Sequence, residues 1–290
     1  MNNTNILKLI QAKYSIFSKG QRLIAEYITE NYDKAAFMTA SKLGRTVGVS
    51  ESTVVRFAIA LEFSGYPKLQ EALQELIKNK LTTVQRLNMT DDLSNTKKLY
   101  KEILKADIEN IKSTIDGLDE ITFNEVVDKI CSAEKVYVLG LRSSSTLAAY
   151  FGFYLGFILK NVKVVVFGTS DVFEQLLKVD KNDIVIGIGY PRYSRKTLEA
   201  LKYVREQGCK VVGITDSYVS PIANLADYPL IAASNLVSLV DSLVAPMSLI
   251  NSLIIAIANK NKQEVSHYFT KLEQIWDKYN IYDGKEKFSL

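Results

Sequence analysis

The sequence predicts two domains, an all-α N-terminal domain that contains a helix-turn-helix and an α/β C-terminal domain built on a five-stranded parallel, doubly wound sheet. The length of 290 residues leaves room for two domains. Apolar residues recur at helical spacing from Gln21 to Lys80. Further on, five apolar runs alternate with helical patterns. The expected parts are a helix-turn-helix domain at 1–80, a connector at 81–106, and an α/β domain with a C-terminal helical tail at 107–290.

Composition fits a soluble globular protein, with 47% hydrophobic and 23% charged residues. Residues 1–90 hold 12 Lys and Arg against 7 Asp and Glu, whereas the remaining 200 residues hold 24 against 25. This excess of positive charge in the N-terminal third suits a polyanionic partner. Cys131 and Cys209 have no metal-ligand spacing, and the N-terminus lacks the order of a signal peptide. We therefore expect a reduced, cytoplasmic setting and no metal site.

One apolar run, Leu236 to Ala258, is long enough to be considered as a membrane span. Uncompensated polar groups are costly in lipid, so the polar residues within the run favour a buried helix and no membrane partner. That helix could belong to a subunit interface or to the intramolecular core, and the sequence leaves both open. The interrupting residues are Ser238, Asp241, Ser242, Pro246, Ser248, Asn251 and Ser252.

The stretch TASKLGRTVGVSESTVVRFAIAL predicts the helix-turn-helix. Leu43 and Val47 give a short first helix an apolar face. Gly44 lets a second helix approach closely, and Gly48 can adopt the left-handed conformation that ends the first helix. Val49 then fills the corner between the two helices.

The second helix of this motif has its own start signal and its own apolar stripe. Ser50 is a natural N-cap, and Val54, Phe57 and Leu61 form the stripe that would be buried. In a helix-turn-helix the second helix lies in the major groove of DNA, and a plain three-helix bundle is the alternative.

Groove contacts are expected from the outward face of the second helix. Hydroxyl groups donate to phosphates or bases, and an arginine can pair with guanine through two hydrogen bonds. Basic residues nearby could add phosphate contacts. The candidate DNA-binding residues are Ser50, Glu51, Ser52, Thr53 and Arg56, with Lys42, Arg45 and Lys68 as phosphate contacts.

The five predicted strands are apolar, β-branched runs separated by helical patterns, which is typical of a parallel sheet covered on both faces. Ligands of such sheets bind beyond the C-terminal ends of the strands. The runs are Lys135–Leu141, Val162–Gly168, Asp183–Tyr190, Cys209–Asp216 and Asp227–Ala233.

Three loops at these strand ends carry hydroxyl and basic side chains. In the first, Gly140–Ser145, the N-H groups of a helix N-terminus and serine hydroxyls can surround a phosphate. The second is Tyr190–Thr197, and the third, Thr215–Asp227, begins another helix at Ser220. Ser and Thr also cap helices, so capping alone is the alternative. The candidate ligand-binding residues are Arg142, Ser143, Ser144, Ser145, Arg192, Ser194, Arg195 and Thr197.

The sequence predicts binding without turnover. It contains no nucleophile triad, metal-ligand cluster or Walker-type loop. His267, the sole histidine, is remote in sequence from the three loops, and Glu174 and Glu199 are explained as charges on helix faces. The first loop, GLRSSS, lacks the second and third glycines of a dinucleotide fingerprint. We therefore expect no catalytic residue and no cofactor.

The run VSESTVVRF followed by EFSGYPKLQ resembles the N-terminal domain of RpiR-type bacterial transcription regulators. Residues 107–262 resemble a sugar isomerase (SIS) domain, and the union of the two is the architecture of that family. The resemblance implies that Ser143 and Ser145 of the first loop, with Ser194 and Thr197 of the second, hold the phosphate of a sugar phosphate.

Two features depart from the pattern of the family. Its second loop usually reads Ser-x-Ser-Gly-x-Thr, whereas here Pro191 stiffens the loop and Arg192, Arg195 and Lys196 add positive charge. Arg142 stands where the family often has a second glycine or alanine. These changes still favour an anion, with its identity as a common sugar phosphate left open.

The resulting expectation is a transcription regulator of carbohydrate metabolism that binds double-stranded operator DNA and senses a phosphorylated sugar or a similar anion. It would act as a homodimer or tetramer, because half-sites lie about 34 Å apart. The alternatives are a sugar-phosphate isomerase or lyase of the SIS fold with an N-terminal helical extension, and a ligand-independent regulator with a vestigial pocket.

Overall fold

The computed structural model describes residues 6–78, 84, 86, 99–168, 170–235 and 240–282. They form two compact units that divide near residue 95, and each unit is described by itself. Most of the expected connector before Leu99 lies outside the described residues, as do Leu236 and Val237 at the start of the apolar run. Helix α9 carries the chain into the second unit.

The N-terminal unit is all-helical, as predicted. Its core is closed by Ile24, Leu43, Val54 and Phe57, none of which has exposed surface. The Phe17 ring packs on Phe57 with 5.1 Å between ring centroids. The elements are α1 (Ile6–Lys13), a short 3-10 turn (Tyr14–Ile16), α2 (Lys19–Glu30), α3 (Tyr32–Ala35), α4 (Ala40–Val47), α5 (Glu51–Ala60) and α6 (Tyr66–Lys78).

The turn between α4 and α5 has the predicted geometry. Gly48 ends α4 with a φ of 75°, in the left-handed region, and the Val49 N-H donates to the Gly44 carbonyl at 2.8 Å. Ser50 caps α5 by accepting from the Thr53 N-H at 3.3 Å. A Cβ on Gly44 would lie 2.8 Å from the Val49 carbonyl oxygen, so the glycine permits this close approach.

Helix α6 is fixed to the chain before α4 by a buried tyrosine. The Tyr66 hydroxyl donates to the Met38 carbonyl at 2.7 Å, and Gln70 donates to the same oxygen at 3.0 Å. Burial raises the pKa of Tyr66 to about 12, so the hydroxyl remains protonated and keeps donating at neutral pH.

The C-terminal unit contains the predicted five-stranded parallel sheet. The strand order is β2-β1-β3-β4-β5, so β1 lies between β2 and β3. Residue pairs such as Val136 with Ile184 set the register of β1 against β3. The strands are β1 (Val136–Gly140), β2 (Val162–Val165), β3 (Ile184–Ile188), β4 (Lys210–Thr215) and β5 (Tyr228–Ile231).

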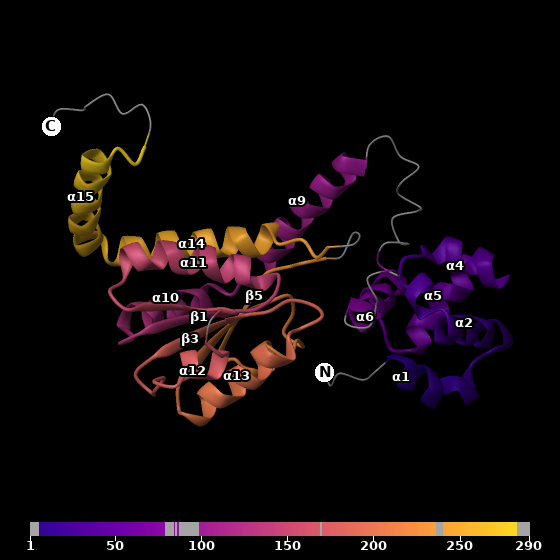
Figure 1. Ribbon diagram of the computed structural model, residues 1–290. Helices are drawn as coiled ribbons and strands as arrows, with labels where there is room; N and C mark the ends of the chain where they lie inside the picture. The colour runs from indigo at the N-terminus through magenta and orange to yellow at the C-terminus, as the bar shows by residue number, and fades with distance from the viewer. Residues whose placement is uncertain are drawn as a thin grey trace. The chain divides into compact units, whose positions relative to one another are not determined.

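Helices cover both faces of this sheet (Figure 1). Buried residues of α10, α11 and α14 share one core with the sheet, and α9 packs against α14. On the opposite face α12, α13 and a short 3-10 helix, Ala223–Leu225, form the other core. The helices are α9 (Leu99–Gly117), α10 (Glu120–Ser132), α11 (Ser144–Ile158), α12 (Val172–Gln175), α13 (Arg195–Glu206), α14 (Val244–Lys260) and α15 (Lys262–Tyr279).

One helix begins later than the sequence predicts. Within the apolar run expected to form one helix, the described residues 240–243 are not helical, and α14 begins at Val244, with Pro246 in its first turn. Helix α12 is short and ends at Gln175. Among the described helices, none is long and apolar enough to cross a membrane. Leu249, Ile250, Leu253 and Ile257 of α14 are buried in the core of their own unit.

Replacing Gly48 should destabilise the helical unit. Gly48→Ala forces a Cβ into the left-handed region, which costs about 1–2 kcal/mol. Urea unfolding followed by far-ultraviolet circular dichroism should show an earlier transition for this unit. The fluorescence of Trp276, the only tryptophan in the sequence, reports on α15 of the other unit and should be unchanged.

Gly65→Ala is the matched control for this substitution. Its new Cβ would lie 3.7 Å from Pro67 Cδ, an ordinary contact, and no positive φ is involved. Equal unfolding curves for the two variants would contradict the role assigned to the left-handed turn.

Candidate nucleic-acid interface and anion pocket

The predicted recognition helix α5 has one buried and one exposed face. Val54 and Phe57 point into the core, whereas Glu51, Ser52 and Arg56 are exposed. Periodicity alone predicted this division, because residues three apart share a helix face. The exposed face therefore presents polar side chains at the N-terminus of the helix.

Hydroxyl groups cluster at that N-terminus. Ser50 Oγ lies 2.9 Å from Ser52 Oγ and 2.8 Å from Thr53 Oγ1. Arg56 Nε donates to the Ser52 carbonyl at 3.3 Å, which holds the guanidinium along the same face. Helix N-terminal N-H groups, hydroxyls and a guanidinium are the donors that DNA-binding helices direct at phosphates and base edges.

The three further basic candidates differ in their surroundings. Lys42 and Arg45 are exposed on α4, and Arg45 reaches Ser41 Oγ at 3.5 Å. Lys68 on α6 forms an exposed ion pair with Glu71 at 2.7 Å. A phosphate would have to compete with that carboxylate for Lys68, so Arg45 is a stronger candidate than Lys68.

A pocket of about 400 Å³ lies where the first and second loops meet, beyond the C-terminal ends of β1 and β3. Seven of the eight predicted ligand-binding residues line it, and Ser145 does not. The Ser145 hydroxyl instead donates to the Arg142 carbonyl at 2.6 Å. The topology thus brings together residues that lie about fifty positions apart in the sequence.

Some hydroxyl groups of the pocket cap a helix, and others make no capping bond. Ser194 caps α13, accepting from the Thr197 N-H at 3.4 Å, and Thr197 is buried. Ser143 stands at the start of α11, is exposed and makes no side-chain capping bond. Ser143 therefore has an exposed hydroxyl that a ligand can engage without loss of a helix cap.

Positive charge surrounds these hydroxyls. Arg142 has a φ of 58° and Arg192 a φ of 62°, a conformation that non-glycine residues seldom adopt and that occurs at functional sites. Arg195 pairs with Glu199 at 2.8 Å. Lys196 pairs with Asp171 and, by hydrogen bonding to it, lowers the pKa of that carboxyl.

The pocket is also lined by Asp241, Tyr190 and Tyr193, none of which was a candidate ligand-binding residue. Asp241 lies in the segment after β5. It is far from both loops in the sequence, so no sequence pattern placed it beside them. Tyr193 donates its hydroxyl to Asp216, at the end of β4. The Tyr190 hydroxyl is buried and has no hydrogen-bond partner in the described part of the chain. Burial, with Asp216 nearby, raises the pKa of Tyr190.

The third predicted loop does not reach this pocket. The Thr215 hydroxyl donates to Ser220 Oγ at 3.0 Å, and Ser220 Oγ accepts from the Ala223 N-H at 3.0 Å. Ser220 thereby bonds to the first residue of the 3-10 helix Ala223–Leu225, whose N-cap is Ile222. The Thr215 and Ser220 hydroxyls therefore stabilise the conformation of their own loop.

Residues weighed as possible catalysts also lie elsewhere. His267 is exposed on α15, and neither it nor Glu174 or Glu199 lines the pocket. Glu174 completes the capping box of α12 by accepting from the Asp171 N-H at 2.9 Å. Within the described ranges, no three His, Cys, Asp or Glu side chains lie close enough to hold a metal ion.

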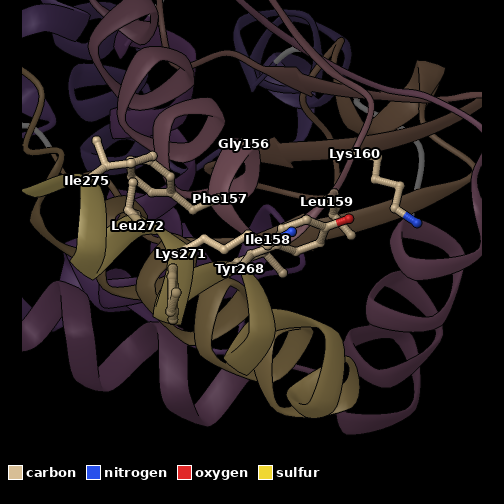
Figure 2. Close-up of a pocket in the computed structure, with 10 residues that line it drawn as sticks. Gly156, Phe157, Ile158, Leu159, Lys160, Tyr268, Lys271, Leu272 and Ile275 are labelled. Atoms are coloured by element: carbon tan, nitrogen blue, oxygen red, sulfur yellow. The ribbon is translucent and has the colours of Figure 1, made fainter. Parts of the chain in front are cut away.

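A second hollow, of about 420 Å³, lies between the end of α11 and α15 (Figure 2). Phe157, Leu272 and Ile275 give it apolar walls, and Tyr268 and Lys160 border it. Its chemistry suits apolar contact, whereas the pocket at the strand ends offers hydroxyls and guanidinium groups. The strand-end pocket is therefore the candidate ligand site.

Comparison with known families agrees with the description of both the helical unit and the α/β unit. Residues 4–80 match the model for the helix-turn-helix domain of the rpiR family, and residues 129–256 match the SIS domain. The chain belongs to the RpiR family. Its helical unit is accordingly the helix-turn-helix domain of that family, and its α/β unit is a SIS domain.

Individual relatives and structures of this family cover most of the chain. HexR of Pseudomonas aeruginosa, an HTH-type transcriptional regulator, is 27% identical over 76% of this chain and 75% of its own. An uncharacterized HTH-type transcriptional regulator of Caldanaerobacter subterraneus is 23% identical over 94% of this chain and 97% of its own.

Two solved structures share the fold. The sugar isomerase domain of an RpiR transcription factor from Sphaerobacter thermophilus has a TM-score of 0.59 at 29% identity, covering 61% of this chain and 99% of its own. The NanR protein of Vibrio vulnificus, solved with ManNAc-6P, has a TM-score of 0.57 at 20% identity, covering 97% of this chain and 100% of its own.

Removing the guanidinium of the recognition helix should weaken DNA binding. We expect Arg56→Ala to lose about 1–3 kcal/mol of affinity for duplexes that the wild-type protein selects from a randomised library. Fluorescence anisotropy at fixed salt measures the change. Arg56→Lys should restore part of the lost affinity if Arg56 contacts a phosphate, and little of it if Arg56 pairs with a base.

Arg205→Ala provides the control, because Arg205 is an exposed arginine on α13 in the other unit. It should bind the selected duplexes like the wild type. If Arg56→Ala does the same with its helical content intact, Arg56 is not a DNA contact.

Proposed function

We propose that this RpiR-family protein is a transcription regulator of carbohydrate metabolism that binds operator DNA through α5 and senses a phosphorylated sugar or a related anion in the strand-end pocket. The observation that carries the proposal is the pairing of the two sites in one chain. A helix-turn-helix with an exposed Arg56 precedes a pocket lined by Ser143, Ser194 and three arginines.

The DNA-binding half is supported by charge and by shape. The N-terminal 90 residues carry the net positive charge of the chain. Ser50 caps α5, and Ser52 and Thr53 lie in its first turn, which is the part of a recognition helix that reaches base edges. Arg56 follows one turn later on the exposed side. Relatives covering about three quarters of the chain are named as HTH-type transcriptional regulators.

The ligand-binding half is supported by the donors of the pocket. The N-terminus of α11, the Ser143 hydroxyl and the Arg142 guanidinium are groups that bind phosphate. The complex of Vibrio vulnificus NanR with ManNAc-6P shows a phosphorylated sugar bound to a protein of this fold. We take from it the chemical class of ligand and not the particular sugar.

We also propose that the protein acts as a homodimer or tetramer. A helix-turn-helix protein reads two half-sites about 34 Å apart with two copies of its domain. Phe153 and Tyr154 of α11 are exposed, as is Ile255 of α14, and apolar surface of this kind is suited to subunit contact. Analytical ultracentrifugation should therefore give at least twice the monomer mass of 32.6 kDa. A monomer at micromolar concentration, with or without DNA, would contradict this assembly.

A SIS-fold isomerase or lyase is the alternative, and Asp241 is the observation that favours it. Its carboxylate lines the pocket and could act as the base that an aldose-ketose isomerisation requires. Incubation with hexose and pentose phosphates separates the two functions. Turnover that Asp241→Asn abolishes would establish the enzyme, whereas ligand-dependent operator binding without turnover would establish the regulator.

Ser143 should be needed for ligand binding but not for stability. In a thermal-shift screen of phosphorylated sugars, we expect Ser143→Ala to lose about 1.5–3 kcal/mol of binding free energy, because a hydrogen bond to a charged phosphate is removed. Its melting temperature without ligand should match the wild type, since the hydroxyl makes no capping bond.

Ser248→Ala on α14 is the control, because the Ser248 hydroxyl donates to the Val244 carbonyl of its own helix and Ser248 does not line the pocket. It should bind ligands normally. If no phosphorylated sugar shifts the melting temperature of the wild type, the protein is a ligand-independent regulator with a vestigial pocket.

A further inference from the structure

Three hydrogen bonds join α9 to the chain that follows β5. The Ala233 N-H donates to Thr114 Oγ1 at 2.9 Å, and the Asn235 N-H donates to Asn110 Oδ1 at 3.2 Å. Ser242 Oγ donates to Asp107 Oδ1 at 2.5 Å. The partners are 119 to 135 positions apart, so these bonds are tertiary contacts that the local chain does not require.

The burial of these polar groups makes the junction specific. Asn110 and Thr114 have 0% and 7% of their surface exposed. Thr114 also donates to the Asn110 carbonyl at 2.8 Å, so its hydroxyl is used as donor and acceptor. Ser234, 1% exposed, donates to the Ser242 carbonyl at 2.8 Å and ties the two ends of the segment together. Breaking the bond of Asn110 or Thr114 to the segment would leave a buried polar group without that partner, which is costly.

The same segment reaches the ligand pocket. Asp241 lines the pocket, and the next residue, Ser242, makes the bond to Asp107 on α9. Consecutive residues have Cα atoms about 3.8 Å apart, so Asp241 cannot move by much unless Ser242 moves with it. A ligand contact at Asp241 is therefore one residue away from a contact with α9.

Helix α9 is in turn the element that connects the pocket unit to the rest of the chain. It begins at Leu99, immediately after the stretch that follows the helix-turn-helix unit in the sequence. A helix transmits a displacement along its axis as a stiff element. Asp107 lies in the N-terminal half of α9, the half nearer in sequence to the DNA-binding unit.

We propose that Asp241 contacts the sugar body of the ligand and that the Ser242–Asp107 bond transmits the effect of this contact to α9. Occupancy of the pocket thereby changes operator affinity. The inference rests on the proposed function and adds the residues that recognise and transmit. Coupling through a hydrogen-bonded junction of this kind requires two arrangements of the junction, which the ligand biases by its differential contact.

The charge of Asp241 specifies which part of the ligand it recognises. A carboxylate accepts hydrogen bonds and repels phosphate oxygens, so its partner is a hydroxyl, amide or ammonium group on the sugar. The arginines and the Ser143 hydroxyl remain for the phosphate. Inorganic phosphate should accordingly occupy the pocket without engaging Asp241, and it should not change operator affinity.

The test uses the full chain and two measurements on each variant. The probe is the phosphorylated sugar that most stabilises the wild type in the thermal-shift panel, with inorganic phosphate alongside. Calorimetry gives the dissociation constant of the probe, and anisotropy gives operator affinity with and without it. In the wild type, the sugar phosphate should change operator affinity by about 5- to 150-fold, the usual range of allosteric coupling.

Uncoupling is the expected result for the junction variants. In Ser242→Ala and Asp107→Ala, the affinity for the probe and the operator affinity without the probe should stay within about threefold of the wild type. The ratio of operator affinities with and without the probe should fall toward one. Asp107→Asn keeps an acceptor oxygen and should retain coupling. Asp116→Ala, at an exposed aspartate near the end of α9 that lines no pocket, should behave like the wild type.

Asp241→Asn tests the recognition step. It should weaken the binding of the sugar phosphate by about tenfold or more, because hydrogen bonds to a charged group contribute most. The affinity for inorganic phosphate should be unchanged. Normal coupling in both Ser242→Ala and Asp107→Ala would overturn the proposed junction while the regulator function stands. Absence of any probe effect on the wild type would overturn that function and, with it, this inference.

Should a junction variant unfold, hydrogen exchange on the wild type decides the question. The amides of α9 around Asp107 should change protection when the sugar phosphate binds and stay unchanged with inorganic phosphate. Equal protection of α9 with both probes would also overturn the proposal.

Discussion

The position of β1 between β2 and β3 is the constraint on which the rest of the C-terminal unit depends. From β1 the chain proceeds outward to β2 and then returns to the other side of β1 as β3. The helices that follow β1 and β3 consequently lie on opposite faces of the sheet, with α11 in one core and α13 in the other. A crevice opens between the two loops where the strand order reverses, and ligands of open α/β sheets bind there.

Much of this arrangement could be predicted from the sequence because it depends on local signals. The β-branched runs define the strands, and their alternation with helices requires parallel pairing. In the helix-turn-helix, Gly48 and Ser50 predict the turn, and the apolar spacing of Val54 and Phe57 predicts which face of α5 is buried. Each of these features is decided within a few residues.

The contribution of Asp241 could not be predicted, because it depends on how a segment beyond β5 returns to the ends of β1 and β3. The polar residues at 241 and 242 were visible in the sequence only as interruptions of an apolar run.

Hydroxyl groups in the loops illustrate a second limit of sequence analysis. Ser143, Ser194 and Ser220 are the same residue type in comparable positions after strands. Ser220 accepts from the Ala223 N-H within its own loop, Ser194 caps α13 at the pocket wall, and Ser143 makes no side-chain capping bond. The backbone geometry at each helix start decides between these roles, and residue type does not.

The left-handed backbone at Arg142 bears on how easily the charge of this pocket could change. Glycine adopts this conformation at no steric cost. Exchange of Arg142 for glycine would therefore delete a cation from the pocket wall while the loop keeps its path. The charge presented to a metabolite could thus change through one substitution, without rebuilding the scaffold that carries it.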